Sequence, residues 1–405
     1  MRIAFVCDNF PLTDNLNGAS SLNYSHLRLL LRAAPGTPVH LVVLNHYGGF
    51  RFEAAKITAE FGEAAITVTL IDFGGETRCK GRKAHLLGRG TRPLRYFYPF
   101  LTEEKIEELG AVLGAIGPDL IWTEHLVANL AVMELTPQVP VVYGHHDFLW
   151  KVARLRNAAQ SWKKRLLNHL FRQAELRLIR ANAFVSGGSQ TELAEIRRVQ
   201  PAAVTAFLPA SYAPVPLPPV HPAGGIRIVH LGTLTATANR IGLERFLRVC
   251  WPPLRGQFPA LECLVIGDLG GTPSAALTGL LGQPGVHTLG YVPVLTQVLH
   301  PYDVFVIPYE HDTGTRTRLP VALNYNQLLV AHQNACKGIA GLEHRVNCLL
   351  AGSLEEMTAL ITQVLAGKID PQPIADRGRQ LFEEAFTVEG QLPRLKSFLS
   401  GIFGG

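Results

Sequence analysis

Residues 308–332, PYEHDTGTRTRLPVALNYNQLLVAH, contain a small-residue loop with two arginines, followed by a helix-like run. Gly314 lets the backbone approach a ligand, and Pro320 is tolerated only in the first turn of a helix. The helix should therefore begin at or just before Arg318. A helix N-terminus offers free N–H groups to an anion, and Arg316 and Arg318 suit charge-assisted contacts to phosphate. The alternative is two solvated arginines on a surface helix.

Histidines and carboxylates occur together at two predicted strand ends in the first half of the chain. Glu124 and His125 end the run PDLIWTEHL, and GHHD at residues 144–147 ends another run. Such side chains at the carboxyl ends of parallel strands suit acid–base chemistry. The GHHD segment, with His145, His146 and Asp147, can be read as an acid–base pair, a set of metal ligands or a turn. Its spacing is poor for a metal and no third ligand is evident, so we expect no metal site.

The composition indicates a globular protein of two or more domains. The 405 residues are 47% hydrophobic and 17% charged, which is enough apolar sequence for large cores. The 38 Lys and Arg against 32 Asp and Glu give a net charge of +6, which suits phosphorylated ligands or anionic lipid and is too weak to indicate nucleic acid. Six scattered cysteines without a CxxC pair predict reduced thiols and a cytoplasmic location. We expect no signal peptide and no membrane-spanning segment.

Short runs rich in Val, Ile and Leu alternate with helical stretches along the whole chain. Continuous apolar runs of this length, separated by helices, predict parallel sheets covered on both faces. Ser189 with Glu192, and Ser353 with Glu356, form capping boxes that each mark a helix start. The predicted strands are residues 3–8, 39–45, 66–73, 119–125, 139–147 and 182–189, then 226–232, 261–267, 286–292, 303–309, 328–332 and 347–351.

A segment rich in proline and glycine, residues 213–225, separates the two series of strands. It cannot be a helix or a central strand and reads as a linker. We therefore expect an α/β protein with an N-terminal domain over 1–213, a linker over 214–225, a C-terminal domain over 226–385, and a last helix over 386–405 that crosses back to the N-terminal domain. Ligands of doubly wound sheets lie beyond the carboxyl ends of the strands, and both edges are expected to face one cleft.

The order of these motifs resembles that of the GT-B glycosyltransferases, most of all the retaining enzymes of family 4, the glycosyl transferases group 1. In the second half the resemblance rests on residues 228–268, 285–332 and 341–361. In the first half it rests more loosely on the segments NLNGASS, PDLIWTEHL, VPVVYGHHD and AFVSGGSQTELAE. The resemblance implies a GT-B fold, in which two Rossmann-like domains with doubly wound parallel sheets face an interdomain cleft.

The resemblance also implies site residues. It places a histidine or an acid near the transferred sugar, at Glu124 or His125 with His125 preferred, and a basic residue for the diphosphate at Arg318. These three are the expected catalytic residues. Of a Lys–Asn pair that many members carry, this chain keeps Asn239, and Arg240 replaces part of the missing charge. The expected donor-binding residues are Gly18, Gly232, Thr233, Asn239, Arg240, Tyr291, Glu310, Asp312, Gly314, Thr315, Arg316 and Arg318.

The sequence departs from the family pattern at two carboxylates. The family places two glutamates eight positions apart around the donor loop, and the second one holds the ribose of the donor. This chain has Thr313 at the first position and Val321 at the second. Glu310 and Asp312 lie just upstream and are the candidate replacements. The phosphate contacts are therefore expected to be kept, while the ribose contact has no matching residue.

Two basic stretches, residues 78–100 and 150–180, lie outside these motifs. The second reads as a basic helix with Trp150, Trp162, Leu166, Leu170 and Phe171 available for one face, which suits an anionic membrane surface. An ordinary solvated helix packed on the N-terminal domain is the alternative. The expected location is cytoplasmic, with peripheral association at the inner face of the plasma membrane.

The expected function is transfer of a sugar, with retention, from a UDP- or GDP-sugar to a glycan or lipid-linked acceptor, as in polysaccharide biosynthesis. The absence of an Asp-x-Asp motif argues against the metal-dependent GT-A class, and we expect no cofactor beyond the donor itself. We expect no nucleic-acid partner. The alternative is a catalytically impaired GT-B relative that binds nucleotide and assists a partner transferase, which the loss of both glutamates favours.

Overall fold

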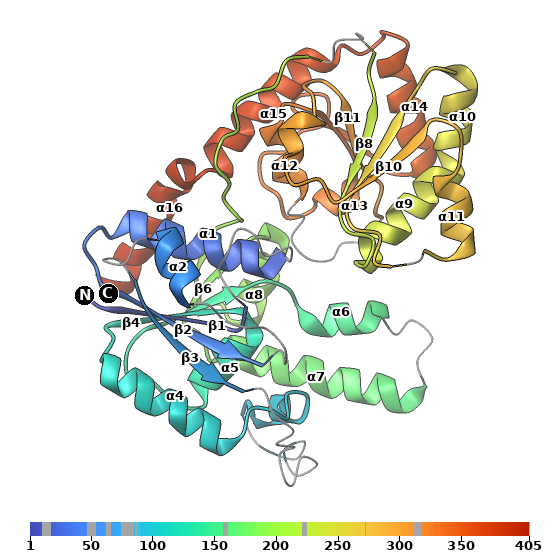
Figure 1. The fold of residues 1–405 in the computed structure, drawn as a ribbon. Coiled ribbons are helices and arrows are strands. Elements are labelled where there is room, and N and C mark those ends of the chain that lie inside the picture. Colours follow the sequence, from blue (N-terminus) through green and yellow to red (C-terminus); the bar gives the residue numbers. More distant parts are fainter. Residues whose placement is uncertain are drawn as a thin grey trace. The chain divides into compact units, whose positions relative to one another are not determined.

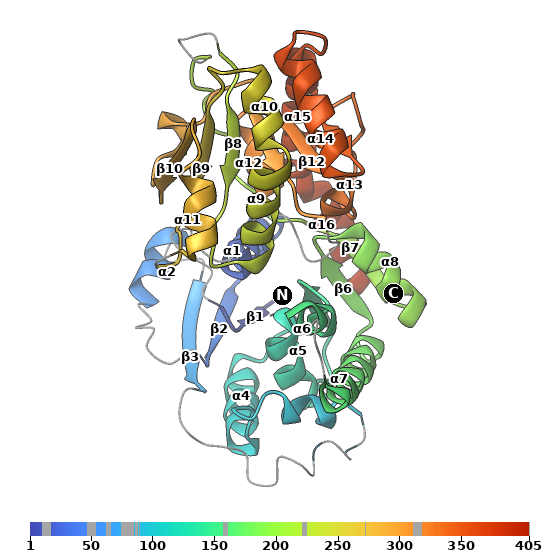
Figure 2. The same ribbon diagram turned by 90° about the vertical axis from the view of Figure 1, so that its right-hand side faces the viewer.

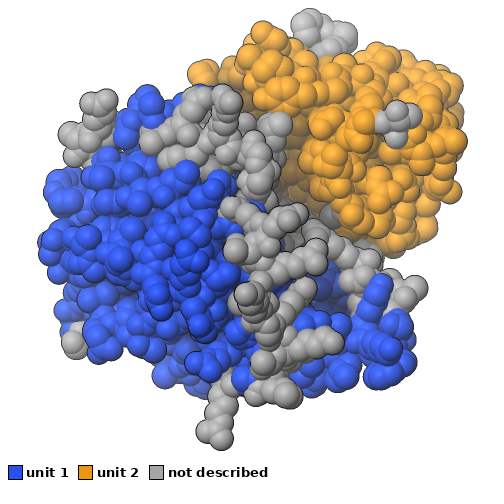
Figure 3. Space-filling view, turned by 60° about the horizontal axis from the view of Figure 1, so that its bottom comes forward, with its two compact units in different colours: residues 1–211, 313–315, 391–405 blue, residues 212–312, 316–390 orange. Residues whose placement is uncertain are grey.

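The computed structural model describes residues 1–9, 18–46, 54–61, 66–73, 85, 88, 90–156, 161–220, 225–271, 273–310 and 318–404. The chain forms two compact units, which Figures 1 and 3 show. Unit 1 holds residues 1–211 and 391–405, and unit 2 holds the described residues of 212–312 and 316–390. Within the described ranges, no helix is long and apolar enough to cross a membrane.

Unit 1 is built on a parallel sheet whose described strands follow the order β3-β2-β1-β4-β5-β6-β7. The central strand β1 pairs with β2 and β4, so that Ile3 lies beside Val39 on one side and Leu120 on the other. Because the strands are parallel, their carboxyl ends lie along one edge of the sheet. The strands are β1 (Ile3–Cys7), β2 (Val39–Asn45), β3 (Ile66–Asp72), β4 (Leu120–Glu124), β5 (Val141–His145), β6 (Phe184–Gly187) and β7 (Val204–Phe207).

Helices cover both faces of this sheet (Figures 1 and 2). Alternation along β4 turns Ile121 into the core cluster that α4, α5 and α7 share, and turns Trp122 to the other face. There the Trp122 ring meets Phe398 of α16 edge-on, with ring centroids 6.3 Å apart. The helices of this unit are α1 (Gly18–Ala33), α2 (Ala54–Phe61), η1 (Arg92–Tyr96), α4 (Glu103–Ile116), α5 (His125–Met133), α6 (Leu149–Arg156), α7 (Trp162–Arg180) and α8 (Gln190–Val199), with most of α16 (Val388–Phe403).

The strands predicted for the first half of the chain are present as β1 to β6, whereas β7 was not predicted. Its sequence, VTAF, is only four residues long and pairs with β6 alone at the edge of the sheet. Val204 is exposed there, so the strand shows neither a continuous apolar run nor a strict alternation. An edge strand of this kind leaves little periodic signal in a sequence.

Unit 2 contains a second parallel sheet, in the order β10-β9-β8-β11-β12-β13 among the described strands. All six were predicted from their apolar runs. The strands are β8 (Ile228–Leu231), β9 (Cys263–Ile266), β10 (Val286–Gly290), β11 (Val304–Ile307), β12 (Leu328–His332) and β13 (Leu349–Ala351). The helices are α9 (Thr237–Val249), α10 (Trp251–Gln257), α11 (Ala275–Leu281), η2 (Leu295–Gln297), α12 (Arg318–Asn324), α13 (Gln333–Cys336), α14 (Leu354–Leu365) and α15 (Pro371–Ala385).

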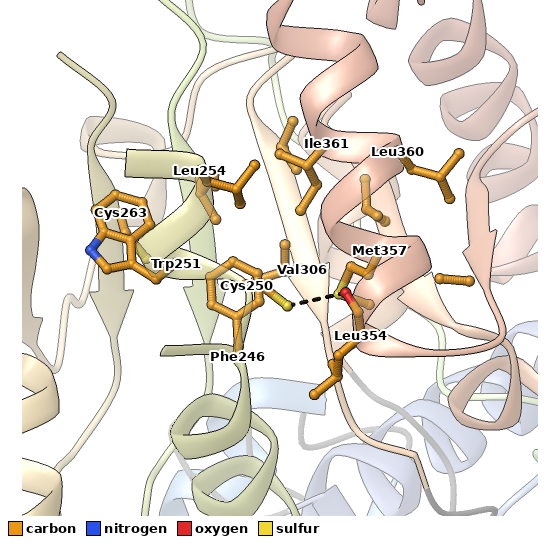
Figure 4. Packing of buried hydrophobic residues seen from close by; sticks show 14 of the residues in the cluster. Phe246, Cys250, Trp251, Leu254, Cys263, Val306, Leu354, Met357, Leu360 and Ile361 are labelled. Atoms are coloured by element: carbon orange, nitrogen blue, oxygen red, sulfur yellow. Dashed lines mark hydrogen bonds between the residues drawn. The ribbon is translucent and has the colours of Figure 1, made fainter. Parts of the chain in front are cut away.

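The core of unit 2 has two layers, one on each face of its sheet. On one face α9, α10 and α14 pack over the strands, and Figure 4 shows Phe246, Trp251 and Met357 fully buried there. On the other face α12, α13 and α15 form a second cluster. Cys250 donates its thiol hydrogen to the carbonyl of Leu354, 3.4 Å away, and burial raises its pKa to about 11. The five described cysteines are all buried, and Cys79 lies outside the described residues.

The predicted helix starts agree with the structure. Ser189 accepts from the N–H of Glu192 at 3.4 Å, and Ser353 accepts from the N–H of Glu356 at 3.1 Å. The helix α12 begins at Arg318, as Pro320 in its first turn requires. Each of these starts is fixed by local chemistry alone, which explains why the sequence was sufficient.

The segment between the units is held by side chains of unit 2. Residues 212–220 form neither helix nor strand. The N–H of Val215 donates to Asn324 Oδ1 at 3.0 Å, and Asn324 Nδ2 donates to the carbonyl of Ala213 at 3.0 Å. Arg379 also donates to the Val215 carbonyl at 3.3 Å. The first part of the proline-rich segment is thus tied to α12 and α15, and residues 221–224 lie outside the described ranges.

Candidate active site

The carboxyl edge of the unit 1 sheet collects titratable side chains from four neighbouring strands. Asp8 follows β1, His46 follows β2, His125 follows β4, and His146 follows β5. These strands are adjacent in the order β2-β1-β4-β5. Because parallel strands end at the same edge, their next residues come together there. Fold topology therefore assembles a histidine–carboxylate cluster from residues far apart in sequence.

Asp8 and His125 form the more exposed pair of this cluster. His125 Nδ1 donates to Asp8 Oδ2 at 2.8 Å, and His46 Nε2 lies 3.3 Å from the same oxygen. Burial alone would raise the pKa of Asp8, but the charge and hydrogen bonds of the two histidines outweigh burial and lower it. Burial likewise lowers the pKa of His125, but the carboxylate of Asp8 outweighs burial and raises it. His125 therefore keeps its proton to a higher pH than a free imidazole does.

The backbone at His125 is unusual. Its φ is +72°, in the left-handed region that residues other than glycine seldom adopt. The residue joins the end of β4 to the first turn of α5 and keeps 18% of its side chain exposed. Strained positions of this kind concentrate at functional sites. Of the two residues predicted at this strand end, His125 is thus the one that keeps part of its side chain exposed.

Glu124 lies inside unit 1. Alternation along β4 turns its carboxylate to the same face as Trp122, and the side chain is fully buried. Its Oε1 accepts from Trp122 Nε1 at 2.5 Å and from His26 Nδ1 at 2.6 Å, and its Oε2 accepts from His146 Nε2 at 2.7 Å. Burial raises the pKa of Glu124, but the two histidines outweigh it and lower the value to about 2. Glu124 therefore has no exposed surface, and both of its carboxylate oxygens are engaged within unit 1.

The two histidines bound to Glu124 differ in charge. His26 donates from both nitrogens, since its Nε2 lies 2.8 Å from the carbonyl of Leu208 and a carbonyl only accepts. His26 is therefore an imidazolium, in agreement with its raised pKa, for which the Glu124 carboxylate outweighs the opposing effect of burial. His146 has a lowered pKa because burial and the charges of His125 and His26 exceed the effect of Glu124. The rings of His125 and His146 stand 5.5 Å apart, which links the two carboxylate–histidine groups.

Gly144 is required by this arrangement. A Cβ at this position would lie 2.5 Å from Glu124 Oε2, closer than real contacts allow. The glycine of the GHHD segment therefore makes room for the buried carboxylate. The next residue, His145, is buried with its Nε2 3.3 Å from Glu192 Oε2. Among the described residues, no group of three or more His, Cys, Asp or Glu is arranged to hold a metal ion.

A second candidate site lies at the carboxyl edge of the unit 2 sheet. Gly232 follows β8 with a φ of +142°, and Gly267 follows β9 with a φ of +134°. A Cβ on Gly267 would stand 2.4 Å from the carbonyl oxygen of Gly232, so the two strand ends approach as only glycines can. Asn239 Nδ2 donates to the Thr233 carbonyl at 2.9 Å and Thr233 Oγ1 donates to the Asp268 carbonyl at 3.2 Å. The loop after β8 is thereby fixed.

Arg318 lies against this loop. Its side chain is 9% exposed, and its Nη1 donates to the Leu231 carbonyl at 2.8 Å. The same nitrogen lies 3.3 Å from Nε2 of His230, a fully buried residue of β8. A Cβ on Gly232 would stand 2.9 Å from Arg318 Cδ, so the arginine side chain passes over this glycine. The predicted neighbours Gly232, Thr233, Asn239 and Arg318 are therefore brought together.

The other predicted donor-binding residues are dispersed or lie outside the described chain. Arg240 is half exposed, with a weak ion pair to Glu244 at 3.8 Å. The carboxylate of Glu310 forms an ion pair with Arg245 of α9, and Tyr291 is 59% exposed beyond β10. Gly18 is the first residue of α1 in unit 1. The predicted residues that fall outside the described ranges are Asp312, Gly314, Thr315 and Arg316, together with Thr313.

Sequence reasoning missed four residues of these two clusters, namely Asp8, His26, His46 and His230. Asp8 and His46 stand at or next to the carboxyl end of a predicted strand, within the segments VCDN and VLNH, whereas His230 lies inside a predicted strand, within the segment IVHLG. For Asp8 and His46, a polar residue at the end of an apolar run was therefore the signal that the sequence offered. His26 lies within α1, and only its contact with Glu124 identifies it.

Comparison with known proteins adds a family match to this geometry. Residues 225–367 match the family model described as Glycosyl transferases group 1. This segment contains β8 to β13 and the group formed by Gly232, Thr233, Asn239 and Arg318, which we call the Arg318 cluster. No curated protein sequence matches the chain.

Solved structures share the fold over the full chain at low sequence identity. HepE from Anabaena, solved with UDP, is 16% identical with a TM-score of 0.66, and the match covers 99% of this chain and 100% of that one. Sucrose-phosphate synthase from Thermosynechococcus elongatus is 17% identical with a TM-score of 0.71, and both chains are covered completely. TarM is 9% identical with a TM-score of 0.67, over 100% of this chain and 99% of that one. The chain therefore has the GT-B fold, as its motif order implied.

Proposed function

We propose that this protein is a glycosyltransferase that moves a sugar from a nucleoside-diphosphate sugar to a glycan or lipid-linked acceptor, with retention of configuration and without a metal ion. The observation that carries the proposal is the Arg318 cluster at the carboxyl end of β8. It lies within the segment that matches the glycosyl transferases group 1. In this proposal unit 2 binds the donor and unit 1 binds the acceptor.

The chemistry of the reaction calls for a fixed cation at the leaving group. As the bond between the sugar and the diphosphate breaks, negative charge grows on the phosphate oxygens. A guanidinium cannot lose its proton in a protein, and its planar fork matches phosphate oxygens. Arg318 is held in place by the Leu231 carbonyl and the backbone of Gly232, so little reorganisation is needed when the charge develops. We assign Arg318 to the diphosphate.

His125 is the residue of unit 1 that we assign to the transferred sugar. Its Nδ1 is engaged by Asp8, so Nε2 is the nitrogen available for a substrate hydroxyl. The raised pKa keeps a hydrogen on Nε2 over a wider pH range, which makes the ring a hydrogen-bond donor. In a retaining reaction the departing phosphate takes the proton of the acceptor hydroxyl on the same face of the sugar. His125 then orients the sugar and does not act as the base.

For the nucleotide, we propose UDP. HepE, which shares the fold, was solved with UDP and with UDP-glucose. The family's ribose-binding glutamate is replaced by Val321, which packs against the core of unit 2. The upstream Glu310 is already paired with Arg245, so it does not supply a free carboxylate for the ribose. The nucleoside is therefore held by other contacts than in the family pattern.

A donor panel tests the proposal. Purified protein is incubated with UDP-, GDP- and ADP-sugars, release of nucleoside diphosphate is measured, and binding is followed by calorimetry. Arg318→Ala should cut turnover at least about tenfold, since it removes a charge-assisted contact. Arg248→Ala, which removes an exposed arginine of α9, is the matched control and should leave turnover unchanged. Absence of both turnover and nucleotide binding with every donor would overturn the proposal.

The second candidate function is a nucleotide-binding protein that assists a partner transferase. Val321 and the occupied Glu310 favour it, because neither position supplies a free carboxylate for the ribose. The same panel separates the two functions. Nucleotide binding without turnover, in the presence of glycan and lipid-linked acceptors, would favour the assisting role.

The first turns of α7 suit an anionic membrane surface, and we propose peripheral association there. Trp162 and Leu166, one turn apart, are 70% and 50% exposed. Lys163, Lys164 and Arg165, which lie between them in sequence, are exposed as well. An exposed apolar pair with neighbouring cations matches the interface of an anionic bilayer. Sedimentation with vesicles of phosphatidylglycerol, but not phosphatidylcholine, should carry the protein down, and Trp162→Ser should weaken this while Leu217→Ser should not.

A further inference from the structure

His230 is a buried polar residue in the middle of an apolar strand. It belongs to β8, where Ile228 and Val229 are fully buried core residues, and it pairs in register with Val265 of β9. The imidazole is itself fully buried. Burying a polar ring costs free energy unless its nitrogens find partners. The fold alone therefore gives no reason for a histidine at this position.

The contact with Arg318 fixes the state of this ring. A guanidinium has only donors, and its Nη1 lies 3.3 Å from His230 Nε2. His230 Nε2 must therefore present its lone pair, and the single ring hydrogen must lie on Nδ1. The pKa of His230 is lowered well below its usual range, first by burial and then by the charge of Arg318. His230 is thus a neutral acceptor.

The second nitrogen of the ring has no structural use. Among the described residues, no hydrogen-bond partner is found for His230 Nδ1. A buried donor left without a partner costs stability, and such groups call for a reason in function. Within the described part of the chain, the side chain of His230 makes its hydrogen-bond contact through Nε2, to Arg318. An apolar residue here would serve the packing of unit 2 as well or better.

Three neighbours confine the side chain of Arg318. Gly232 lies under Arg318 Cδ, and the Leu231 carbonyl accepts from Nη1 at 2.8 Å. His230 Nε2 supplies a second acceptor for the same nitrogen on the inner side. Without this acceptor the guanidinium loses one of the contacts that hold it and gains rotational freedom. A loosely held cation contributes less to binding and to stabilisation of a developing charge.

We propose that His230 is a positioning residue for the diphosphate of the donor, acting through the guanidinium of Arg318. This inference rests on the proposed function, because it assumes that Arg318 binds the diphosphate. His230 itself does not contact the ligand. It lies against Nη1 of Arg318, where only a neutral hydrogen-bond acceptor is tolerated.

Three substitutions separate this role from a merely structural one. In His230→Gln the amide oxygen can take the place of Nε2, whereas in His230→Asn it reaches only the place of Nδ1. His230→Leu removes both. Losing a hydrogen bond to a charged group should weaken UDP binding about tenfold in the Asn and Leu variants. The Gln variant should bind within about threefold of the native protein, since it restores the acceptor.

Thermal unfolding is measured for all three variants, and the Leu variant should be at least as stable as the native protein. UDP affinity that is unchanged in the Asn and Leu variants overturns the proposal. Equal weakening in all three, with the fold intact, also overturns it, because the acceptor at Nε2 would then not matter. If the loss of UDP affinity across the variants correlates with their thermal stability and not with the position of the acceptor, the positioning role is refuted as well.

A second measurement does not depend on nucleotide. Nitrogen NMR of the histidine rings should show His230 with an unprotonated Nε2 in the native protein. In Arg318→Gln the His230 pKa should rise, since a neighbouring cation is removed. A protonated Nε2, or a pKa that does not respond, overturns the pairing. If the native protein binds no nucleotide while this pairing is present, the proposed function fails and the pairing stands.

Discussion

The buried carboxylate of Glu124 should carry a large part of the stability of unit 1. Three donors, on Trp122, His26 and His146, point at its two oxygens, and the side chain is fully buried. Its pKa falls from an ordinary 4.5 to about 2. At about 1.36 kcal/mol for each pH unit, the fold favours the charged form by about 3 kcal/mol. Glu124→Gln should therefore destabilise unit 1 by about 3 kcal/mol at neutral pH.

The same shift sets the pH dependence. A carboxyl whose pKa is lower in the folded state stabilises the fold above its unfolded value and loses this effect as pH falls through the folded value. The contribution of Glu124 is thus complete above pH 4.5 and disappears toward pH 2. In Glu124→Gln this pH-dependent loss should be absent. His26 acts with the opposite sign, because its raised pKa makes its contribution disappear as pH rises.

Hydrogen exchange in urea is the suitable assay, because it can be followed in unit 1 alone. Peptides from residues 120–133 cover β4 and α5 and report the opening free energy of this unit. Glu107→Gln, at an exposed position of α4, is the matched control and should behave as the native protein. A Gln variant at position 124 within about 0.5 kcal/mol of the native protein at pH 7 would refute the reasoning. So would a native-like loss of stability in that variant between pH 4.5 and pH 2.

Three further predictions concern the two sheet edges. Gly144→Ala should destabilise unit 1 by about 1–3 kcal/mol, measured by hydrogen exchange in urea, because the added Cβ would lie 2.5 Å from Glu124 Oε2. An unchanged stability would show that the Glu124 carboxylate can move away. Gly232→Ala should weaken UDP binding, measured by calorimetry, about tenfold. The φ of +142° at this position disfavours a side chain, and the added Cβ would lie 2.6 Å from Asn239 Nδ2. Unchanged UDP affinity would contradict the assignment of this loop to the donor. Asp8→Asn should lower the pKa of His125, because it removes the carboxylate that raises it. The loss of turnover at high pH should then begin at a lower pH, and an unshifted pH profile would exclude His125 as the titrating group.

The two sheet edges differ in how their charges are arranged. In unit 1 the buried His26–Glu124 pair lies beneath the more exposed Asp8–His125 pair, with His146 between the two groups. In unit 2 a single arginine is held by a neutral histidine and a carbonyl. Unit 1 therefore offers hydrogen-bond donors and acceptors suited to hydroxyl groups, and unit 2 offers a permanent cation suited to an anion. This difference agrees with the assignment of acceptor and donor in the proposal.

Local signals were enough for most of the secondary-structure elements. Continuous apolar runs predicted all strands of unit 2, capping residues predicted the starts of α8 and α14, and Pro320 predicted the start of α12. The short edge strand β7 was missed because it is half exposed. The motif order further predicted that Gly232, Asn239 and Arg318 act together, and they are neighbours in the structure. Each of these features depends on residues close in sequence or on a family pattern.

The roles of neighbouring residues could not be read from the sequence. Glu124 and His125 are adjacent, yet one is fully buried and the other partly exposed, because alternation along β4 ends where the backbone turns at His125. The partners of these residues, Asp8 and His26, are more than ninety positions away. Strand order in the sheet brings them together, and no local pattern encodes that order.

By itself, the sequence determined a two-part α/β protein with parallel sheets and the position of several of its helix starts. These follow from periodicity, capping chemistry and backbone restrictions, which act over a few residues. Only the tertiary structure decided which titratable groups are buried, which are paired and which carry charge. The pKa of a side chain depends on the groups packed around it. In this protein those groups belong to strands and helices that are far apart in the sequence.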